Sequence, residues 1–232
     1  MTIYLGIDDT DSLESIGTGR LARSIAQEIG GRFPVIAITR HQFLVHPDIP
    51  YTSHNSGAVI ALEDISDCEM QLLFDMASSL MLSRFVEGSD PGIALARDTM
   101  IIAPVIIFGQ NAQKLVLTQE SARRLATNTG IHLAGLGGTE GGVIGALAGV
   151  GLAASGCDGR FLQIGTIRDA VGDQTVSDIL KTGIEAVMTT DGRIITEGKV
   201  RVRKFPQPVC IMGRPIAIVE EQEGEWVLVK RD

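Results

Sequence analysis

The chain has 232 residues, 44% of them hydrophobic, and a formal net charge of −8. At roughly 150 residues per domain, this length allows one large domain or two small ones. No run of about 18 apolar residues occurs, so a helical membrane span is not expected. The net negative charge argues against an extensive, non-specific nucleic-acid-binding surface.

The N-terminus and the cysteines indicate the compartment. Acidic side chains begin at Asp8, so we expect no secretory signal peptide. The three cysteines, Cys68, Cys157 and Cys210, lie far apart and form no CxxC pair. We therefore expect free thiols rather than a disulfide framework or a zinc ribbon, in a cytoplasmic protein.

The first half of the chain alternates strand and helix patterns. The expected elements are, in chain order, a strand over 2–7, a helix over 18–29, strands over 34–44 and 58–62, a helix over 66–85, and short apolar segments over 93–96 and 100–107. The segment over 100–107 fits either a strand or a helix. A polar loop, 45–57, separates the second strand from the third.

The second half begins with a helix and a glycine-rich stretch. Thr118 is a suitable N-cap for a helix through Thr127. Gly135–Gly151 then holds eight glycines, and the small and aliphatic residues over 143–154 predict a helix packed closely against a neighbour. A strand over 160–165 and a short helix over 177–182 follow. The tail contains only expected strands, over 185–189, 193–196, 199–203, 208–212, 215–219 and 225–229. The pattern predicts an α/β (α+β) chain with an α/β region over 1–184 and a small β module over 185–232.

The strongest chemical signal is the run Gly6-Ile7-Asp8-Asp9-Thr10-Asp11-Ser12 at the end of the first strand. Hard oxygen ligands at this density suit Mg²⁺ with a bound polyphosphate. We therefore assign Asp8, Asp9 and Asp11 to the metal and Thr10 and Ser12 to phosphate. The alternative is a turn with helix-capping acids.

The next helix begins near Thr18, and its N-terminal amides would face a phosphate. Gly17 and Gly19 would let the backbone come close to such a ligand.

A second signal is the loop from Gly137 to Gly145. Its backbone N–H groups could wrap phosphates, which makes Gly138, Gly141 and Gly142 candidate nucleotide contacts. The loop is not a Walker motif, because no Gly-Lys-Ser/Thr follows. Turn formation and tight helix packing are the alternative explanation.

Two further groups of residues are candidates. Arg40 lies near the end of the second strand and could contact phosphate, while His54, Asn55 and Gly57 on the following polar loop could line a second substrate. A plain surface loop is the alternative. In the tail, Lys199, Arg201 and Arg203 alternate along one strand face, next to Lys204. We interpret this stripe as a solvated face that could make a modest contact with an anion or nucleic acid.

These signals occur together, and in the same order, in one family, so the sequence resembles the archaeal isoleucine-tRNA agmatinylcytidine synthetases. The resemblance rests on the Gly-Ile-Asp-Asp-Thr-Asp-Ser motif, Thr18, His46-Pro47-Asp48-Ile49-Pro50, the run from His54 to Val59, and the segment Gly141 to Ala148. It covers roughly residues 1 to 165.

The resemblance implies a kinase-like catalytic domain with a ferredoxin-like module. Such a domain binds ATP and Mg²⁺, phosphorylates a cytidine carbonyl and lets agmatine displace the phosphate. Asp8, Asp9 and Asp11 would hold metal and phosphate, and Thr18 would match a threonine that itself accepts phosphate. These four residues are the expected catalytic set.

The sequence departs from the family in three ways. It lacks the paired cysteines of the family's zinc ribbon, its tail is too short for the ribbon together with the family's β-barrel, and Gly141 stands where the family has arginine. We expect an ATP- and Mg²⁺-dependent phosphoryl-transfer enzyme whose acceptor is either a small molecule or tRNA. The alternatives are a non-catalytic nucleotide-binding or regulatory module and a tRNA-binding protein acting with a partner. A homo-oligomer is left open.

Overall fold

The computed structural model describes residues 1–8, 17–49, 55–84 and 87–229. Contacts between residues divide the chain into two compact units, Met1–Ser155 (unit 1) and Gly156–Asp232 (unit 2). The sequence placed a boundary between residues 184 and 185 instead. Residues 160–184 group with the tail because the strands Arg160–Ile164 and Gly172–Thr175 pair with tail strands.

Unit 1 is built on a five-stranded antiparallel sheet in the order β5-β4-β1-β3-β2. Its strands are β1 (Thr2–Asp8), β2 (Val35–Gln42), β3 (Ser56–Glu63), β4 (Gly92–Arg97) and β5 (His132–Gly135). Helices α1 (Thr18–Ile29) and α2 (Asp67–Leu82) connect β1 to β2 and β3 to β4. Two βαβ connections are therefore interleaved, with β1 and β3 at the centre of the four strands.

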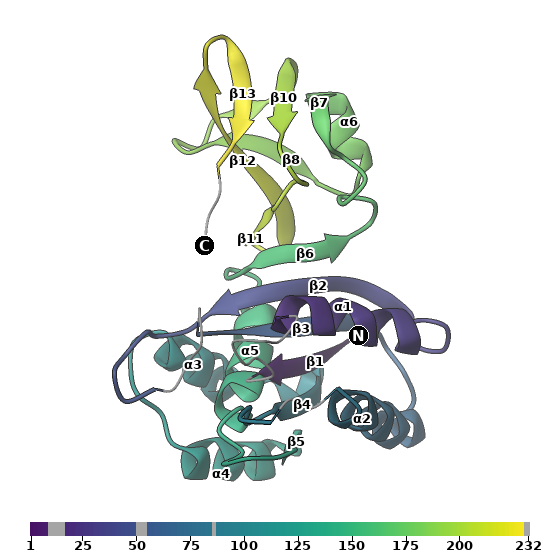
Figure 1. Cartoon of the computed structure of the whole chain (residues 1–232), viewed down its shortest axis with the longest axis vertical. Coiled ribbons are helices and arrows are strands. Elements are labelled where there is room, and N and C mark those ends of the chain that lie inside the picture. Colours follow the sequence, from purple (N-terminus) through teal and green to yellow (C-terminus); the bar gives the residue numbers. More distant parts are fainter. Residues whose placement is uncertain (9–16, 50–54, 85–86, 230–232) are drawn as a thin grey trace. The chain divides into compact units, whose positions relative to one another are not determined.

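Helices cover both faces of this sheet (Figure 1). Alternate residues of a strand point to opposite faces, so Leu5 and Ile7 pack toward α1 and α2 while Gly6 faces α5 (Val143–Ser155). Beyond α5 lie α3 (Ala103–Ala112) and α4 (Gln119–Thr129), and a short 3₁₀ helix, Asp98–Met100, precedes α3. The core of unit 1 is thus two apolar layers, one on each side of the sheet.

Helix α5 approaches its neighbours closely, as its small residues predict. A Cβ atom at Gly92 of β4 would lie 2.1 Å from the carbonyl carbon of Gly142, and one at Gly6 would lie 2.3 Å from the carbonyl oxygen of Ala146. Only glycine fits at such distances from backbone atoms. This packing brings the start of α5 against the end of β1 and the start of β4.

Unit 2 is a β module, and within its described residues it contains one short helix (Figure 1). Its strands pair in the order β6-β11-β12-β13-β10-β7, β8 pairs with β12, and β9 pairs with β8. Their bounds are β6 (Arg160–Ile164), β7 (Gly172–Thr175), β8 (Ala186–Thr189), β9 (Ile194–Ile195), β10 (Lys199–Val202), β11 (Val209–Ile211), β12 (Arg214–Gln222) and β13 (Glu225–Leu228). Helix α6 (Val176–Lys181) follows β7.

Most expected elements are confirmed, and the mixed α+β class with them. The helix expected over 18–29 has those bounds, and the ambiguous segment over 100–107 contains the start of a helix, α3. Strands β5 and β7 were not expected. Each has only four residues, and both contain glycine and polar residues that give no alternating apolar pattern.

Candidate functional site

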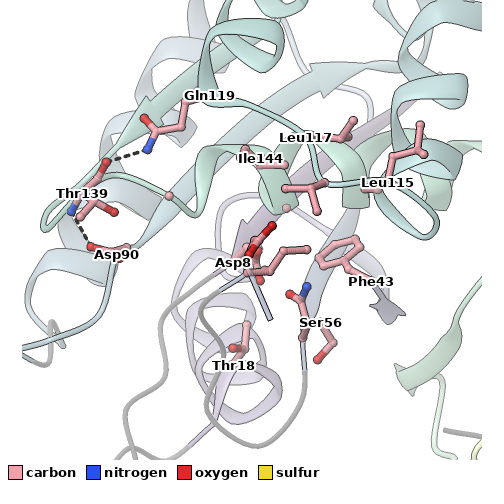
Figure 2. Close-up of a pocket in the computed structure, with 17 residues that line it drawn as sticks. Asp8, Thr18, Phe43, Ser56, Asp90, Leu115, Leu117, Gln119, Thr139 and Ile144 are labelled. Carbon is pink, nitrogen blue, oxygen red and sulfur yellow. Dashed lines mark hydrogen bonds between the residues drawn. The ribbon is translucent and has the colours of Figure 1, made fainter. Parts of the chain in front are cut away.

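A cavity of about 250 Å³ lies in unit 1 where β1 ends and where α1 and α5 begin (Figure 2). Several elements and loops contribute to its wall, so it draws together residues far apart in the sequence. The lining residues are Asp8, Thr18, Phe43, Asp48, Ile49, Asn55, Ser56, Asp90, Ala112, Leu115, Val116, Leu117, Gln119, Thr139, Gly141, Ile144 and Gly145.

Asp8 is the last residue of β1 and stands at the centre of this wall (Figure 2). The residue is 9% exposed, because β4 pairs with it at Gly92 and helix α5 covers it. A Cβ atom at Gly145 would lie 1.7 Å from Asp8 Oδ2, so the carboxylate occupies the space above this glycine. The first turn of a helix favours negative charge. The N-terminus of α5 is therefore a favourable neighbour for an acidic side chain at position 8.

Thr18 lies across the cavity at the start of α1 and is 8% exposed. Gly17 is the N-cap with φ of 88°, a left-handed conformation that glycine adopts without strain. The first turn of α1 contains no acidic residue. Because Thr18 lines the cavity, the positive end of this helix dipole lies at the cavity wall, where it favours an anion.

The glycine-rich loop is fixed by its neighbours (Figure 2). The Thr139 N–H donates to the Asp90 carboxylate, and Gln119 Nε2 donates to the Thr139 carbonyl at 2.8 Å. The Gly142 N–H donates to the Asp90 carbonyl at 2.8 Å. These bonds hold the loop against the start of β4 and against α4.

The three candidate glycines of that loop are placed differently. Gly141 lines the cavity, whereas Gly138 and Gly142 are not among the lining residues. A Cβ atom at Gly138 would lie 2.0 Å from Asp90 Oδ1, and one at Gly142 would lie 2.5 Å from the Gly92 nitrogen. Both positions therefore have a packing reason to be glycine.

The opposite wall comes from the end of β2 and the start of β3. Asn55 Nδ2 donates to the Leu44 carbonyl at 2.6 Å, and the Asn55 carbonyl accepts from the Phe43 N–H at 2.8 Å. These bonds fix Asn55 at the cavity edge. Gly57 packs behind it, against the ring of Phe43.

Arg40 is not a lining residue but contacts one. Its Nε donates to Ser56 Oγ at 2.9 Å, and Ser56 lines the cavity. Gly17 and Gly19 are likewise not lining residues, although they flank Thr18. Asp9, Thr10, Asp11, Ser12 and His54 lie outside the residues that the structure describes.

An apolar wall is the feature that the sequence analysis missed. Leu115, Val116 and Leu117 line the cavity beside Ile144 and Phe43 (Figure 2). Leu115 and Val116 are 53% and 45% exposed, and Leu117 is partly exposed. Such exposure is unusual for three consecutive aliphatic residues. That run, directly before the N-cap Thr118, was the available signal.

The charges of the wall are of one sign. Asp8, Asp48 and Asp90 line the cavity, and no Lys, Arg or His is among its described lining residues. A polyphosphate would be repelled there unless a cation accompanied it. Within the described ranges no three His, Cys, Asp or Glu side chains come together as a ready metal site. Asp8 is the expected metal ligand that this part of the chain contains.

Several curated proteins are similar in sequence to part of this chain. No protein-family model matches the chain. It is 28% identical over 155 residues to the isoleucine-tRNA 2-agmatinylcytidine synthetase TiaS of Cenarchaeum symbiosum, and 29% identical over 157 residues to that of Pyrococcus horikoshii. The matches cover 64% and 65% of this chain but only 33% and 36% of those proteins. The chain thus spans about a third of the length of these relatives.

Solved structures give the same result. The crystal structure of a complex of TiaS with its isoleucine tRNA and ATP is 25% identical to this chain with a TM-score of 0.56, covering 65% of this chain and 36% of that one. The expected resemblance is confirmed for part of the chain. Separately, none of the helices in the described residues is long and apolar enough to cross a membrane.

Proposed function

Because about two thirds of this chain is TiaS-like, we propose that unit 1 is an ATP- and Mg²⁺-dependent phosphoryl-transfer domain. The observation that carries the proposal is the buried Asp8 carboxylate in a cavity whose described lining has three carboxylates and no basic side chain. Similarity to proteins whose solved structures include an ATP complex supports the nucleotide.

Different residues would bind the metal, contact the phosphates and exclude water at this site. Asp8, with Asp9 and Asp11, would hold Mg²⁺, and the ion would neutralise the charge of the transferred phosphoryl group. The α1 N-terminus and Gly141 would direct backbone N–H groups at the phosphates, with Thr10 and Ser12 as further contacts. The apolar wall over 115–117 would shield the site from water.

Thr18 and Asn55 are positioned for the two reaction partners. The Thr18 side chain lies on the cavity wall at the positive end of α1, which supports a role at the transferred phosphate. Asn55 and Gly57 border the side where a second substrate would enter, and Arg40 would act through Ser56. The acceptor is either a small molecule or tRNA, the substrate named in the relatives' description.

We also propose that β1-α1-β2-β3-α2-β4 is the ferredoxin-like module, with its start at Thr2 and its end at Arg97. The strand order β4-β1-β3-β2 with all neighbours antiparallel supports this assignment. Helices α3 to α5 and the glycine-rich loop would complete the kinase-like part.

Mg²⁺-dependent ATP consumption in the presence of a panel of small amines, small carbonyl compounds and tRNA tests the function. We expect turnover by the wild type, loss of about 100-fold or more in Asp8→Ala, and little change in Asp48→Asn. Asp48 is the matched control, because it lines the same cavity but its side chain is 76% exposed. Nucleotide binding without turnover would favour the non-catalytic module, for which the glycine at position 141 is the supporting observation.

A further inference from the structure

Unit 2 contains a second cavity, of about 470 Å³, on the outer face of its sheet. Across three neighbouring strands, Arg201 of β10 pairs with Val227 of β13, which pairs with Glu220 of β12. Directly paired residues share a face of a sheet, so these three side chains form one row. Val200 and Val202 alternate with Arg201 and point into the core. The segment Arg203–Gln207 forms the rim.

The basic stripe noted in the sequence borders this groove. Arg201, Arg203 and Lys204 all line it, and all three are exposed. Arg201 forms an ion pair with Glu225. Within the described part of unit 2, no carboxylate pairs with Arg203 or Lys204. Glu220 is the single acidic residue among the lining residues described, so the groove carries a net positive charge.

The charge of the chain is distributed unevenly between its units. Residues 1–155 contain nine Lys and Arg against sixteen Asp and Glu, whereas residues 156–232 contain eleven against twelve. Unit 1 therefore accounts for nearly all of the net charge of −8. The groove is a positive patch on a unit that is itself almost neutral, so the overall acidity does not prevent it from attracting an anion.

Aromatic, amide and apolar groups complete the groove. The Arg168 guanidinium lies 4.2 Å from the centroid of the Phe205 ring and holds that ring in place. Arg160 Nη1 donates to Gln207 Oε1 at 2.7 Å, which orients the Gln207 amide. Val227 and Val229 alternate along the chain and share this face, so they form an apolar floor. Positive charge beside an aromatic ring and oriented amides is the combination that binds single-stranded nucleic acid.

We propose that this groove binds a single-stranded nucleic-acid segment. Arg203 and Lys204 contact its phosphates, and Phe205 with the apolar floor receives an unstacked base. A duplex keeps its bases stacked inside and offers only its backbone to such a groove. This inference goes beyond the phosphoryl-transfer proposal, because none of its residues belongs to the cavity of unit 1.

Fluorescence anisotropy of a labelled single-stranded RNA of about ten nucleotides, mixed with the full chain in the absence of ATP, tests the proposal. We expect binding that weakens with salt, with a slope of log K against log salt of about −1.4 for two phosphate contacts. The double variant Arg203→Glu, Lys204→Glu should bind at least about tenfold more weakly. The matched control is Lys181→Glu, Arg214→Glu, which changes the net charge equally at two residues outside the groove and should leave affinity near wild type.

A third variant separates stacking from charge. Phe205→Leu should lower affinity about fivefold or more while leaving the salt slope unchanged. Equal weakening by the two charge-reversal pairs would overturn the proposal, as would equal affinity for a duplex or for a polyglutamate peptide. Circular dichroism melting of each variant checks that it is folded. The measurement does not depend on ATP turnover, so a failure of the groove proposal can be distinguished from a failure of the phosphoryl-transfer proposal.

Discussion

At the scale of single residues, the contact between Asp8 and Gly145 decides the geometry of the cavity in unit 1. The carboxylate occupies the place where any other residue at position 145 would put its Cβ atom. Gly145→Ala must therefore move Asp8, since the helix backbone cannot retreat from β1 and β4. We expect ATP turnover to fall about 100-fold, the order of loss that follows a misplacement of about 1 Å.

Gly149→Ala is the control for that substitution. Gly149 lies one helical turn farther along α5, and its Cβ would meet only Val59 Cγ2, at 3.1 Å. We expect turnover near the wild-type value and a free energy of unfolding within about 1 kcal/mol of wild type. Equal turnover by the two alanine variants would contradict the role given to the Asp8 position.

Some residues that line the cavity could be chosen from the sequence, and others could not. Asp8, Thr18, Asn55 and Gly141, chosen from local motifs, all line one cavity although they span more than half of the chain. Asp90 was not predicted, because it fixes the glycine-rich loop through a hydrogen bond with Thr139, 49 positions away in the sequence. Such contacts follow from the topology of the sheet, which a local pattern does not contain.

At the scale of elements, the close packing of α5 on the sheet positions the site. Gly92→Ala would place a Cβ atom 2.1 Å from a backbone carbon of Gly142, where no flexible side chain can give way. We expect a loss of about 1–3 kcal/mol in the free energy of unfolding, measured by urea denaturation. Gly31→Ala is the control, because no atom lies within 4 Å of its added Cβ. A Gly92→Ala chain as stable as Gly31→Ala would show that α5 is not held this tightly.

Helix α6 offers a test of local electrostatics. The hydroxyl of Thr175, its N-cap, donates to Asp178 at 2.7 Å, and Lys181 donates to the same carboxylate at 3.0 Å. The Thr175 hydrogen bond, followed by that of Lys181, lowers the pKa of Asp178 from 3.8 to about 2. Because the folded-state pKa is depressed, this stabilisation is complete above about pH 4 and is lost as the pH falls toward 2.

Thr175→Val should raise the pKa of Asp178 toward 3.8 and weaken that pH dependence, while Lys181 keeps part of the lowering, as followed by NMR titration of the carboxyl carbon. Ser177→Ala, in the same helix, is the control and should leave the titration unchanged. An unaltered pKa of Asp178 in Thr175→Val would refute the hydrogen bond as its main cause.

The elements that the sequence predicted differ from those it missed in how local their signals are. Helices α1, α2, α4 and α5 have an amphipathic face, a capping residue or a run of small residues that is visible locally. Strands β5 and β7 are recognisable only through their partners, β4 and β10. Pairing with a distant strand can impose a short β segment on residues with little intrinsic preference for it.

At the scale of the whole molecule, the chain forms two compact units that differ in net charge. The acidic unit 1 contains the cavity lined by three carboxylates, and the nearly neutral unit 2 contains the positive groove. The accompanying prediction is that residues 1–155, made alone, fold cooperatively and bind nucleotide as the full chain does. Circular dichroism melting and calorimetry of that fragment check it, and a fragment without a cooperative transition would contradict it.

The central claim is that Asp8 binds a divalent ion together with a nucleotide. Its most direct test is isothermal titration calorimetry of the full chain with a non-hydrolysable ATP analogue, with and without Mg²⁺. We predict binding that requires Mg²⁺, falls at least about tenfold in Asp8→Asn and persists in Asp48→Asn. Equally tight binding without the ion, or unchanged affinity in Asp8→Asn, would contradict the account.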